Sequence, residues 1–234
     1  MWGNFSFDYA CSSARGRSGG LVTLWDPNVF VKNQFWCGDN YIIVEGKWMN
    51  SVENYYLINV YGPQHQPEKA NLWAFLRSFI QNHVGNTILF GDLNEVRNEL
   101  ERFGSSFSTI DASIFNTFIH DAGLIDLPMG GRQFTWMNKA GSKLSKIDRF
   151  LISDGVSQTH PDDPYPKRKK ENKYTFDNFI VAILWSEEVN EIMKGRCYVF
   201  EYGRVKSKFG GMVLYYCGIE ENQPKGREDQ ASNK

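Results

Sequence analysis

The chain has few cysteines and no arrangement of them that suggests a metal or disulfide framework. Cys11, Cys37, Cys197 and Cys217 are widely scattered, form no CxxC pair and have no histidine at metal-ligand spacing. Secreted small domains and zinc modules both depend on closely patterned cysteines. We therefore predict no zinc site and expect a reducing, intracellular compartment.

The chain also lacks a strong charge of either sign and any long apolar segment. Its 26 basic and 27 acidic residues give a net charge of -1. Such a balance creates no global field that would attract nucleic acid, so nucleic-acid binding would need a local patch. No apolar run approaches membrane-spanning length, and the amino terminus lacks the charged and apolar regions of a signal peptide. We expect no membrane contact, and the composition indicates no oligomeric state.

The residues that are present suit a sizeable hydrophobic core. Of the 234 residues, 41% are hydrophobic and 15% are aromatic, which is enough for one large domain or two small ones. Predicted strands outnumber predicted helices, and helices separate some of the strands, so we predict an α/β domain with sheet packed on sheet and helices outside. The predicted strands are 5–11, 21–25, 41–49, 55–61, 88–90, 134–137 and 146–152, and the predicted helices are 67–82 and 110–122.

The stretch from Ile88 to Glu95 carries the most distinctive pattern. Its apolar run predicts a strand buried on both faces, and Gly91 is expected to let the backbone turn at the carboxyl end. Asp92 and Asn94 then share a face, since side chains two apart on an extended segment point the same way. A carboxylate can accept a proton or hold a hard metal ion, and an amide can orient a substrate oxygen. An equally weighted alternative is a capping turn before a helix.

Three other patterns place polar or aromatic side chains near predicted strand ends. Tyr61 precedes a Gly-Pro turn, where its hydroxyl could project into a cleft or its ring could cover the edge of the core. Asp148 alternates with apolar residues, so it is either a site residue or the partner of Arg149 in a strand salt bridge. Thr135 and Trp136 could pack in the fold or contact a nucleic-acid base by stacking.

The composition changes after residue 155. Three prolines fall within 161–166, which excludes regular structure there. The basic run 167–170 is either a solvated linker, the more frequent use of such a run, or a nuclear-import or phosphate-binding tract. We divide the chain into a domain at 1–155, a proline-rich and basic linker at 156–173, an unassigned segment at 174–219 that could pack on the domain, and a polar tail at 220–234 that we expect to be disordered.

In this order, the patterns resemble the endonuclease/exonuclease/phosphatase superfamily. More narrowly, they are similar to the endonuclease domain of plant LINE-type (non-LTR) retrotransposons. The resemblance is colinear over about residues 2–155. It is carried by Arg15-Gly16-Arg17-Ser18-Gly19-Gly20-Leu21, Leu24-Trp25-Asp26-Pro27, Tyr61-Gly62-Pro63, Gly91-Asp92-Leu93-Asn94-Glu95, Asp126-Leu127-Pro128-Met129-Gly130-Gly131, Arg132-Gln133-Phe134-Thr135-Trp136 and Lys146-Ile147-Asp148-Arg149-Phe150.

This resemblance implies a four-layer α/β sandwich, in which two mixed sheets pack face to face with helices outside. It also implies hydrolysis of a DNA phosphodiester, usually with Mg²⁺. In the family pattern Asp92 would align or deprotonate the attacking water, and Asn94 would hold a phosphate oxygen. Tyr61 would contact the scissile phosphate or the leaving group. Asp148 would orient a catalytic histidine.

We assign four further residues to substrate binding. By the resemblance, Arg15 and Arg17 would lie near the nucleic-acid backbone, because their glycine-rich loop matches the family. Thr135 and Trp136 are the candidates for contact with a base. DNA is the partner that these assignments imply.

Two parts of the family pattern are missing. No Gln-Glu-Thr segment, which carries the metal-ligating glutamate, and no Ser-Asp-His segment, which carries the catalytic histidine, occurs in the sequence. We therefore assign no metal ligand and expect an incomplete sandwich, truncated at both ends. Loss of a single general acid or base typically costs ~10²–10⁴-fold in rate. We expect reduced or absent activity, and the alternatives are a catalytically dead nucleic-acid- or protein-binding module and a non-functional relic.

Overall fold

The computed structural model describes residues 7–12, 21–49, 51–128 and 133–158, with two short strands at 208–209 and 212–213. Arg15 and Arg17 lie outside the described residues. So does the predicted linker beyond residue 158, together with the tail and nearly all of the unassigned segment. No helix within the described ranges is long and apolar enough to cross a membrane.

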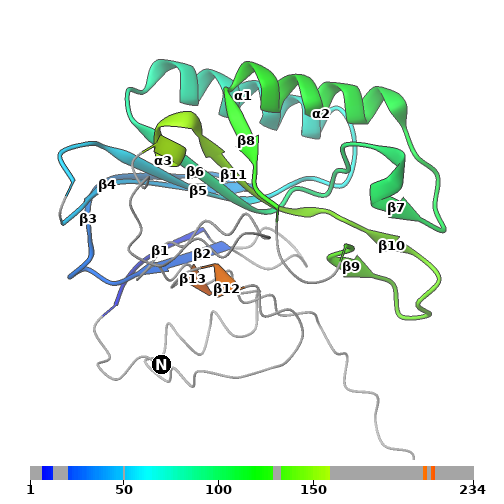
Figure 1. Ribbon diagram of the computed structural model, residues 1–234, viewed down its shortest axis with the longest axis horizontal. Coiled ribbons are helices and arrows are strands. Elements are labelled where there is room, and N and C mark those ends of the chain that lie inside the picture. The colour runs from blue at the N-terminus through cyan, green and yellow to red at the C-terminus, as the bar shows by residue number, and fades with distance from the viewer. Residues whose placement is uncertain are drawn as a thin grey trace, which may run out of the picture.

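A mixed six-stranded sheet organises the described part of the chain (Figure 1). Its strands lie in the order β3-β4-β5-β6-β11-β8. The β5–β6 pair is parallel and the other four pairs are antiparallel. The parallel pair therefore brings the carboxyl ends of two strands to one edge of the sheet. The bounds are β3 Phe30–Cys37, β4 Tyr41–Trp48, β5 Tyr55–Tyr61, β6 Asn86–Asp92, β8 Leu124–Asp126 and β11 Asp148–Ser153.

Two helices cover one face of this sheet, α1 (Glu68–Asn82) and α2 (Thr109–Asp121), as Figure 1 shows. Their apolar stripes pack on the sheet through a core cluster that includes Leu76, Phe115 and Leu89. Ser108 begins α2 by accepting a hydrogen bond from the Asp111 backbone N–H at 3.2 Å. The shorter helices are η1 (Glu99–Glu101) and α3 (Asp154–Gln158), and α3 packs against β6 and β11.

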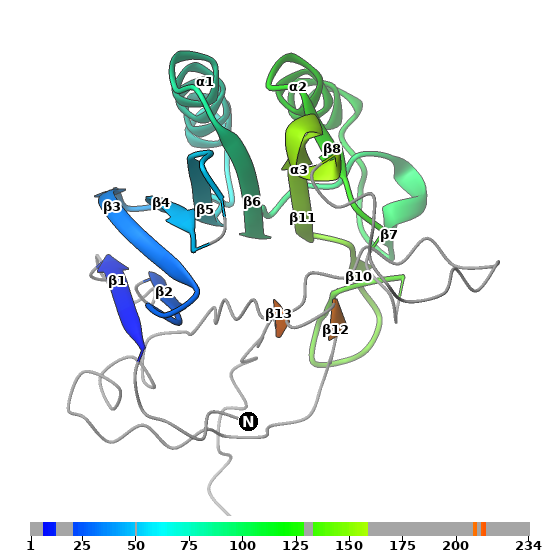
Figure 2. The same cartoon turned by 60° about the vertical axis from the view of Figure 1, so that its left-hand side comes forward.

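The opposite face of the sheet is covered by an antiparallel pair, β1 (Asp8–Ser12) and β2 (Leu21–Trp25), which Figure 2 shows on the side away from the helices. A second core cluster, which includes Trp25, Phe90 and Phe150, fills the space between the two sheets. The described chain is therefore a layered sandwich of helices, a large sheet and a small sheet.

Two small sheets complete the described structure. The first has the order β7-β10-β9, and the second is the β12–β13 pair. The first follows the loop after β6 and leads into β11, so it borders the edge where the strand ends meet. The bounds are β7 Arg102–Phe103, β9 Trp136–Met137, β10 Leu144–Ser145, β12 Lys208–Phe209 and β13 Met212–Val213.

The α/β sandwich predicted from the sequence is confirmed. The strands predicted at 21–25, 41–49 and 55–61 and both helices are present within a few residues of their predicted bounds. Strands β3 and β8 were not predicted, because β3 is a mostly exposed edge strand and β8 has only three residues, so neither has a strong apolar pattern. Buried Val156 extends the core past the predicted boundary at 155.

The prediction that the chain turns at Gly91 is wrong. Strand β6 continues through Gly91 to Asp92, and both residues pair with β5 and β11. The alternative that Asp92 and Asn94 cap a helix is also wrong, since the next helical turn is η1 and Asn98 caps it.

Candidate functional site

Tyr61, Asp92 and Asp148 form a row across three neighbouring strands. Tyr61 ends β5 and lies opposite Asp92, which ends β6, and Asp92 lies opposite Asp148, which begins β11. Because facing residues in a sheet point to the same side, the three side chains project together. Asp92 and Asp148 are each two residues from Phe90 and Phe150, and therefore point to the same face of the sheet as these two rings. Both rings lie in the core on the β1–β2 side, and Tyr61 packs against that core, so the row projects toward that side. The structure thus brings together three residues separated by up to 87 positions in sequence.

Gly91 allows the strands in this row to approach closely. Its φ of +131° is a conformation that other residues rarely adopt, and a Cβ placed there would collide with the Val60 carbonyl oxygen. The glycine therefore keeps Asp92 close to β5. Its role is close approach within the strand, and the turn itself begins one residue later.

Asn94 completes the row from a tight turn directly after β6. Its φ of +50° lies in the left-handed region, which is uncommon for residues other than glycine. The Asn94 backbone N–H donates to Asp92 Oδ1 at 2.8 Å, and Asn94 Nδ2 donates to the Gly62 carbonyl at 2.7 Å. The Gly62 N–H in turn donates to the Asp92 carbonyl at 2.7 Å. These bonds fix the Asp92–Asn94 turn against the end of β5, beside the Tyr61 hydroxyl.

The acidic residues of the row ionise less readily than ordinary carboxyls. Burial raises the pKa of Asp92 to about 6, against the opposing effects of the Asn94 N–H and the Lys69 charge. Burial, and then the charge of Asp92, raise the pKa of Asp148 to about 7. Burial and Asp92 also raise the pKa of the Tyr61 hydroxyl. Near neutral pH the two carboxyls therefore compete for protons and titrate as a pair.

Thr135 supports the row from the small sheet. Its hydroxyl oxygen accepts hydrogen bonds from the backbone N–H groups of Ile147 at 3.0 Å and Asp148 at 3.1 Å. A hydrogen bond from Thr135 also lowers the pKa of Asp148, in opposition to burial. Trp136 is 43% exposed in β9, so it is available to a ligand and is not part of the core.

The alternative that Asp148 pairs with Arg149 in a salt bridge is wrong. Arg149 projects to the opposite face of β11, where its guanidinium is fully buried over the Phe115 ring. Its Nη1 donates to Asp126 Oδ2 at 2.6 Å, and its Nη2 pairs with Glu101. Asp148 therefore remains in the row with Asp92, and Arg149 anchors the loop that follows that row.

The described residues do not by themselves provide a closed metal site. Within the described ranges, no group of three or more His, Cys, Asp and Glu side chains is arranged to hold a metal ion. The only acidic groups of the row are the carboxyls of Asp92 and Asp148, and their raised pKa values mean that they ionise less readily than usual. Mg²⁺ prefers several oxygen ligands in octahedral geometry. These residues therefore do not fit an Mg²⁺ site.

Two of the histidines lie away from the row. His83 follows the end of α1, where its ring stacks on Phe79, and His120 lies near the end of α2 beside Asp121. Neither side chain is placed to be oriented by Asp148 as the family pattern requires. His160 lies outside the described residues.

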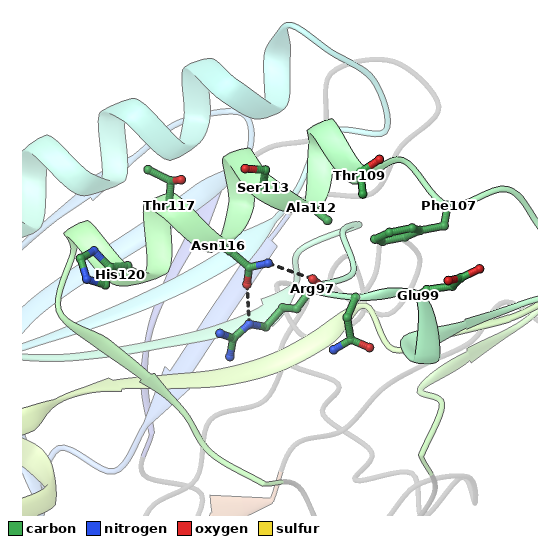
Figure 3. Close-up of a pocket in the computed structure, with 10 residues that line it drawn as sticks. Arg97, Glu99, Phe107, Thr109, Ala112, Ser113, Asn116, Thr117 and His120 are labelled. Atoms are coloured by element: carbon green, nitrogen blue, oxygen red, sulfur yellow. Dashed lines mark hydrogen bonds between the residues drawn. The ribbon is translucent and has the colours of Figure 1, made fainter.

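A hollow of about 630 Å³ lies between α2 and the loop that precedes it (Figure 3). It is lined by Arg97, Phe107 and Ser113 among others, and none of the predicted site residues lines it. Within it, Arg97 Nε donates to Asn116 Oδ1 at 2.8 Å. That bond holds the arginine side chain against α2.

Sequence reasoning missed the residues behind the row. Lys69 and Glu95 form a buried ion pair beside Asn94, and a hydrogen bond joins Gln64 to the Tyr61 side chain. A signal for Lys69 was available. It shares a helix face with Leu72, Trp73 and Leu76, and a lysine in an apolar stripe requires a buried partner.

No protein-family model and no curated protein matches this sequence. Solved structures do resemble the chain. The catalytic domain of APE2 from Xenopus laevis matches with a TM-score of 0.51 and 16% identity, over 65% of this chain and 68% of that domain. The endonuclease domain of TRAS1, a telomere-specific non-LTR retrotransposon, matches with a TM-score of 0.49 and 16% identity, over 64% of this chain and 68% of that one.

The AP endonuclease LMAP from Leishmania major matches with a TM-score of 0.48 and 14% identity, over 64% of this chain, which spans 62% of that enzyme's length. These proteins share the endonuclease/exonuclease/phosphatase fold. At 16% identity, the likeness to the APE2 catalytic domain shows the fold of this chain and nothing finer.

Proposed function

We propose that this chain is an endonuclease/exonuclease/phosphatase-type domain of plant LINE retrotransposon origin that binds DNA and hydrolyses its phosphodiesters slowly or not at all. One observation carries the proposal, namely the row of Tyr61, Asp92 and Asp148 across three strands, completed by Asn94. The fold shared with the APE2 catalytic domain supports the same class.

The chemistry of the row suits attack on a phosphodiester by water. A general base works best when its pKa lies near the working pH, and the Asp92 carboxyl, with a pKa of about 6, meets that condition. The Asn94 amide and the Tyr61 hydroxyl are hydrogen-bond donors that stabilise charge on a phosphate. Asp92 is the base in this proposal, Asn94 holds a phosphate oxygen, and Tyr61 contacts the phosphate or the leaving oxygen.

Two features support a low rate. Neither the Gln-Glu-Thr nor the Ser-Asp-His segment occurs in the sequence. Burial and the charge of Asp92 raise the pKa of the Asp148 carboxyl to about 7, so it ionises less readily than an ordinary carboxyl, and a protonated carboxyl orients an imidazole poorly. Dependence on Mg²⁺ belongs to the proposal through the family resemblance, although the described residues alone do not fit that ion.

The other assignments extend the proposed DNA contact. Trp136 offers an exposed ring for base stacking. Thr135, the residue before it, accepts a hydrogen bond from the Asp148 backbone N–H. Arg15 and Arg17 would contact phosphates, and the basic run 167–170 would serve nuclear import. The two arginines and the basic run lie outside the described residues, so their roles stay predictions.

A nicking assay tests the proposal. Purified full-length chain is incubated with supercoiled plasmid and Mg²⁺, with EDTA and Asp92→Ala as controls. Slow nicking that disappears in both controls supports hydrolysis at the row. Nicking that survives Asp92→Ala would indicate a contaminating nuclease and count against it.

The second candidate function is DNA binding without hydrolysis. Fluorescence anisotropy with a labelled DNA duplex tests it. Affinity that falls steeply as the salt concentration rises from about 50 to about 200 mM supports phosphate contact. Weaker binding on replacing Arg15 and Arg17 would assign that contact to the glycine-rich loop. Absence of both nicking and DNA binding would leave a protein-binding module or a non-functional relic.

A further inference from the structure

Behind the row lies a buried ion pair that contacts the turn directly. Lys69 Nζ is 2.8 Å from Glu95 Oε2, and the two side chains are 8% and 4% exposed. The same ammonium group donates to the Asn94 carbonyl oxygen at 2.7 Å. Glu95 Oε1 accepts from the Val96 N–H at 3.0 Å. Lys69 therefore connects the first turn of α1 to the backbone of Asn94, 25 residues away.

The Lys69 ammonium contacts a residue whose backbone conformation is unfavourable. Asn94 lies in the left-handed region at φ +50°, a conformation that persists only where surrounding contacts hold it. The Asp92 carboxylate and the Gly62 carbonyl hold the Asn94 N–H and side-chain amide from the front. The Lys69 ammonium holds the remaining polar backbone group, the carbonyl, from behind.

A purely structural role does not explain the charges. Burying a lysine and a glutamate together is often neutral or unfavourable compared with apolar side chains of the same size, because desolvation offsets their attraction. The neighbouring Leu72, Trp73 and Leu93 are all buried, so the ion pair lies in an apolar part of the core. The ammonium group adds a donor to the Asn94 carbonyl and a positive charge that lowers the pKa of Asp92, effects that no apolar side chain supplies.

We propose that Lys69 is a positioning residue of the candidate active site, which sets the Asn94 amide and supports the Asp92 carboxylate, with Glu95 as its counter-ion. The role rests on the proposed function of the row. Lys69 contacts neither substrate nor reacting atoms, and it acts through Asn94 and Asp92.

The test uses the full chain with Lys69→Met/Glu95→Gln, which removes both charges together. Because both members of the ion pair are replaced, no buried charge is left unpaired. Glutamine keeps an oxygen that can accept from the Val96 N–H. We expect its thermal midpoint to shift by only a few degrees. The NMR signal of the Asn94 side-chain amide should move toward that of a free asparagine, its exchange with water should accelerate, and the pKa of Asp92 should rise.

Where the wild-type chain nicks plasmid, nicking should fall by about 10- to 100-fold, the order expected when a reacting group is displaced by about 1 Å. Lys69→Arg, which keeps a charged donor, should restore the Asn94 signal at least in part. Arg77→Met on the same helix is the matched control, because Arg77 pairs with exposed Asp121 at 3.1 Å and does not contact the row.

The outcomes separate this proposal from the proposed function. If the wild-type chain never nicks DNA, the proposed hydrolysis fails while the Asn94 and Asp92 signals still decide the role of Lys69. An unchanged Asn94 amide in the folded double variant would overturn the positioning role. So would unchanged nicking by an active double variant, or failure of that variant to fold, since the pair would then serve global stability.

Discussion

Asp148 lies directly opposite Asp92 where the antiparallel strands β11 and β6 pair. Two carboxyl groups in facing positions, Asp148 buried and Asp92 partly buried, repel each other when both are ionised. The charge of one carboxyl therefore raises the pKa of the other, and this coupling can be measured without any substrate.

The first prediction concerns the coupling of the two carboxyls. Asp92→Asn removes the charge that, after burial, does most to raise the pKa of Asp148. We expect the pKa of Asp148 to fall below its wild-type value of about 7, as measured by ¹³C NMR titration of the carboxyl group. The exposed substitution Glu99→Gln is the control and should leave the pKa of Asp148 unchanged. Equal titration of Asp148 in wild type and Asp92→Asn would show that the two groups do not interact.

The second prediction concerns stability and pH. The pKa of Asp148 rises from an ordinary 3.8 to about 7 on folding, so the folded chain binds this proton more tightly than the unfolded chain. Stability therefore falls as the pH rises between those two values, and the full penalty is present above about pH 7. Asp148→Asn removes the penalty, so we expect the free energy of unfolding to increase by on the order of 2–4 kcal/mol at pH 8.

This gain should shrink toward pH 4, where the wild-type carboxyl is protonated in both states. Urea denaturation at pH 5 and pH 8 measures it. A gain of the same size at both pH values, or a loss at pH 8, would contradict the assignment of a raised pKa to this group.

The third prediction concerns Gly91. A Cβ at this position meets the Val60 carbonyl oxygen and also requires a strained φ, so Gly91→Ala should lower the free energy of unfolding by about 3 kcal/mol or more. Gly123→Ala is the matched control. Gly123 also has a positive φ, of +62°, but no atom lies within 4 Å of the place that a Cβ would occupy, so only the cost of the left-handed conformation, about 1–2 kcal/mol, should be observed. Comparable losses in the two variants would show that the close approach of β5 to β6 is unimportant.

The sequence patterns indicated the strand ends that carry Tyr61 and Asp92, but not the buried residues that support them. The apolar runs before Tyr61 and Asp92 predicted β5 and β6, because strands buried on both faces need continuous hydrophobic residues. The order of motifs along the chain then placed Asp148 with them. Tyr61, Asp92 and Asp148 lie on neighbouring strands, so the register of strand pairing alone is enough to align them.

The residues that support the row could not be assigned in the same way. Lys69 and Arg149 have partners 26 and 48 positions away, and a single sequence does not specify which of many carboxylates lies within reach. For Arg149 the pattern suggested its neighbour Asp148, yet adjacent residues on a strand point to opposite faces. The alternation of side chains along β11 is by itself enough to exclude that pairing.

The last prediction concerns the buried network of Arg149. Its guanidinium joins Glu101, which follows the site loop, to Asp126 in the edge strand β8. Burial opposes ionisation of Glu101, but the hydrogen bond and charge of Arg149 hold the pKa of that carboxyl below its usual range. Arg149→Met leaves both carboxylates short of a partner in the interior, so we expect a loss of about 3–5 kcal/mol in the free energy of unfolding.

Arg77→Met removes an ion pair from the surface and is the comparison, with an expected loss of at most about 1 kcal/mol. Denaturation of the two variants at pH 7 measures the difference. Because Arg149 lies behind the row, its loss should also free the loop between β6 and α2, which hydrogen exchange of the amides at 97–102 can detect. Equal stability losses for the two arginines would mean that the loop is held by its backbone bonds and that the ionic network contributes little.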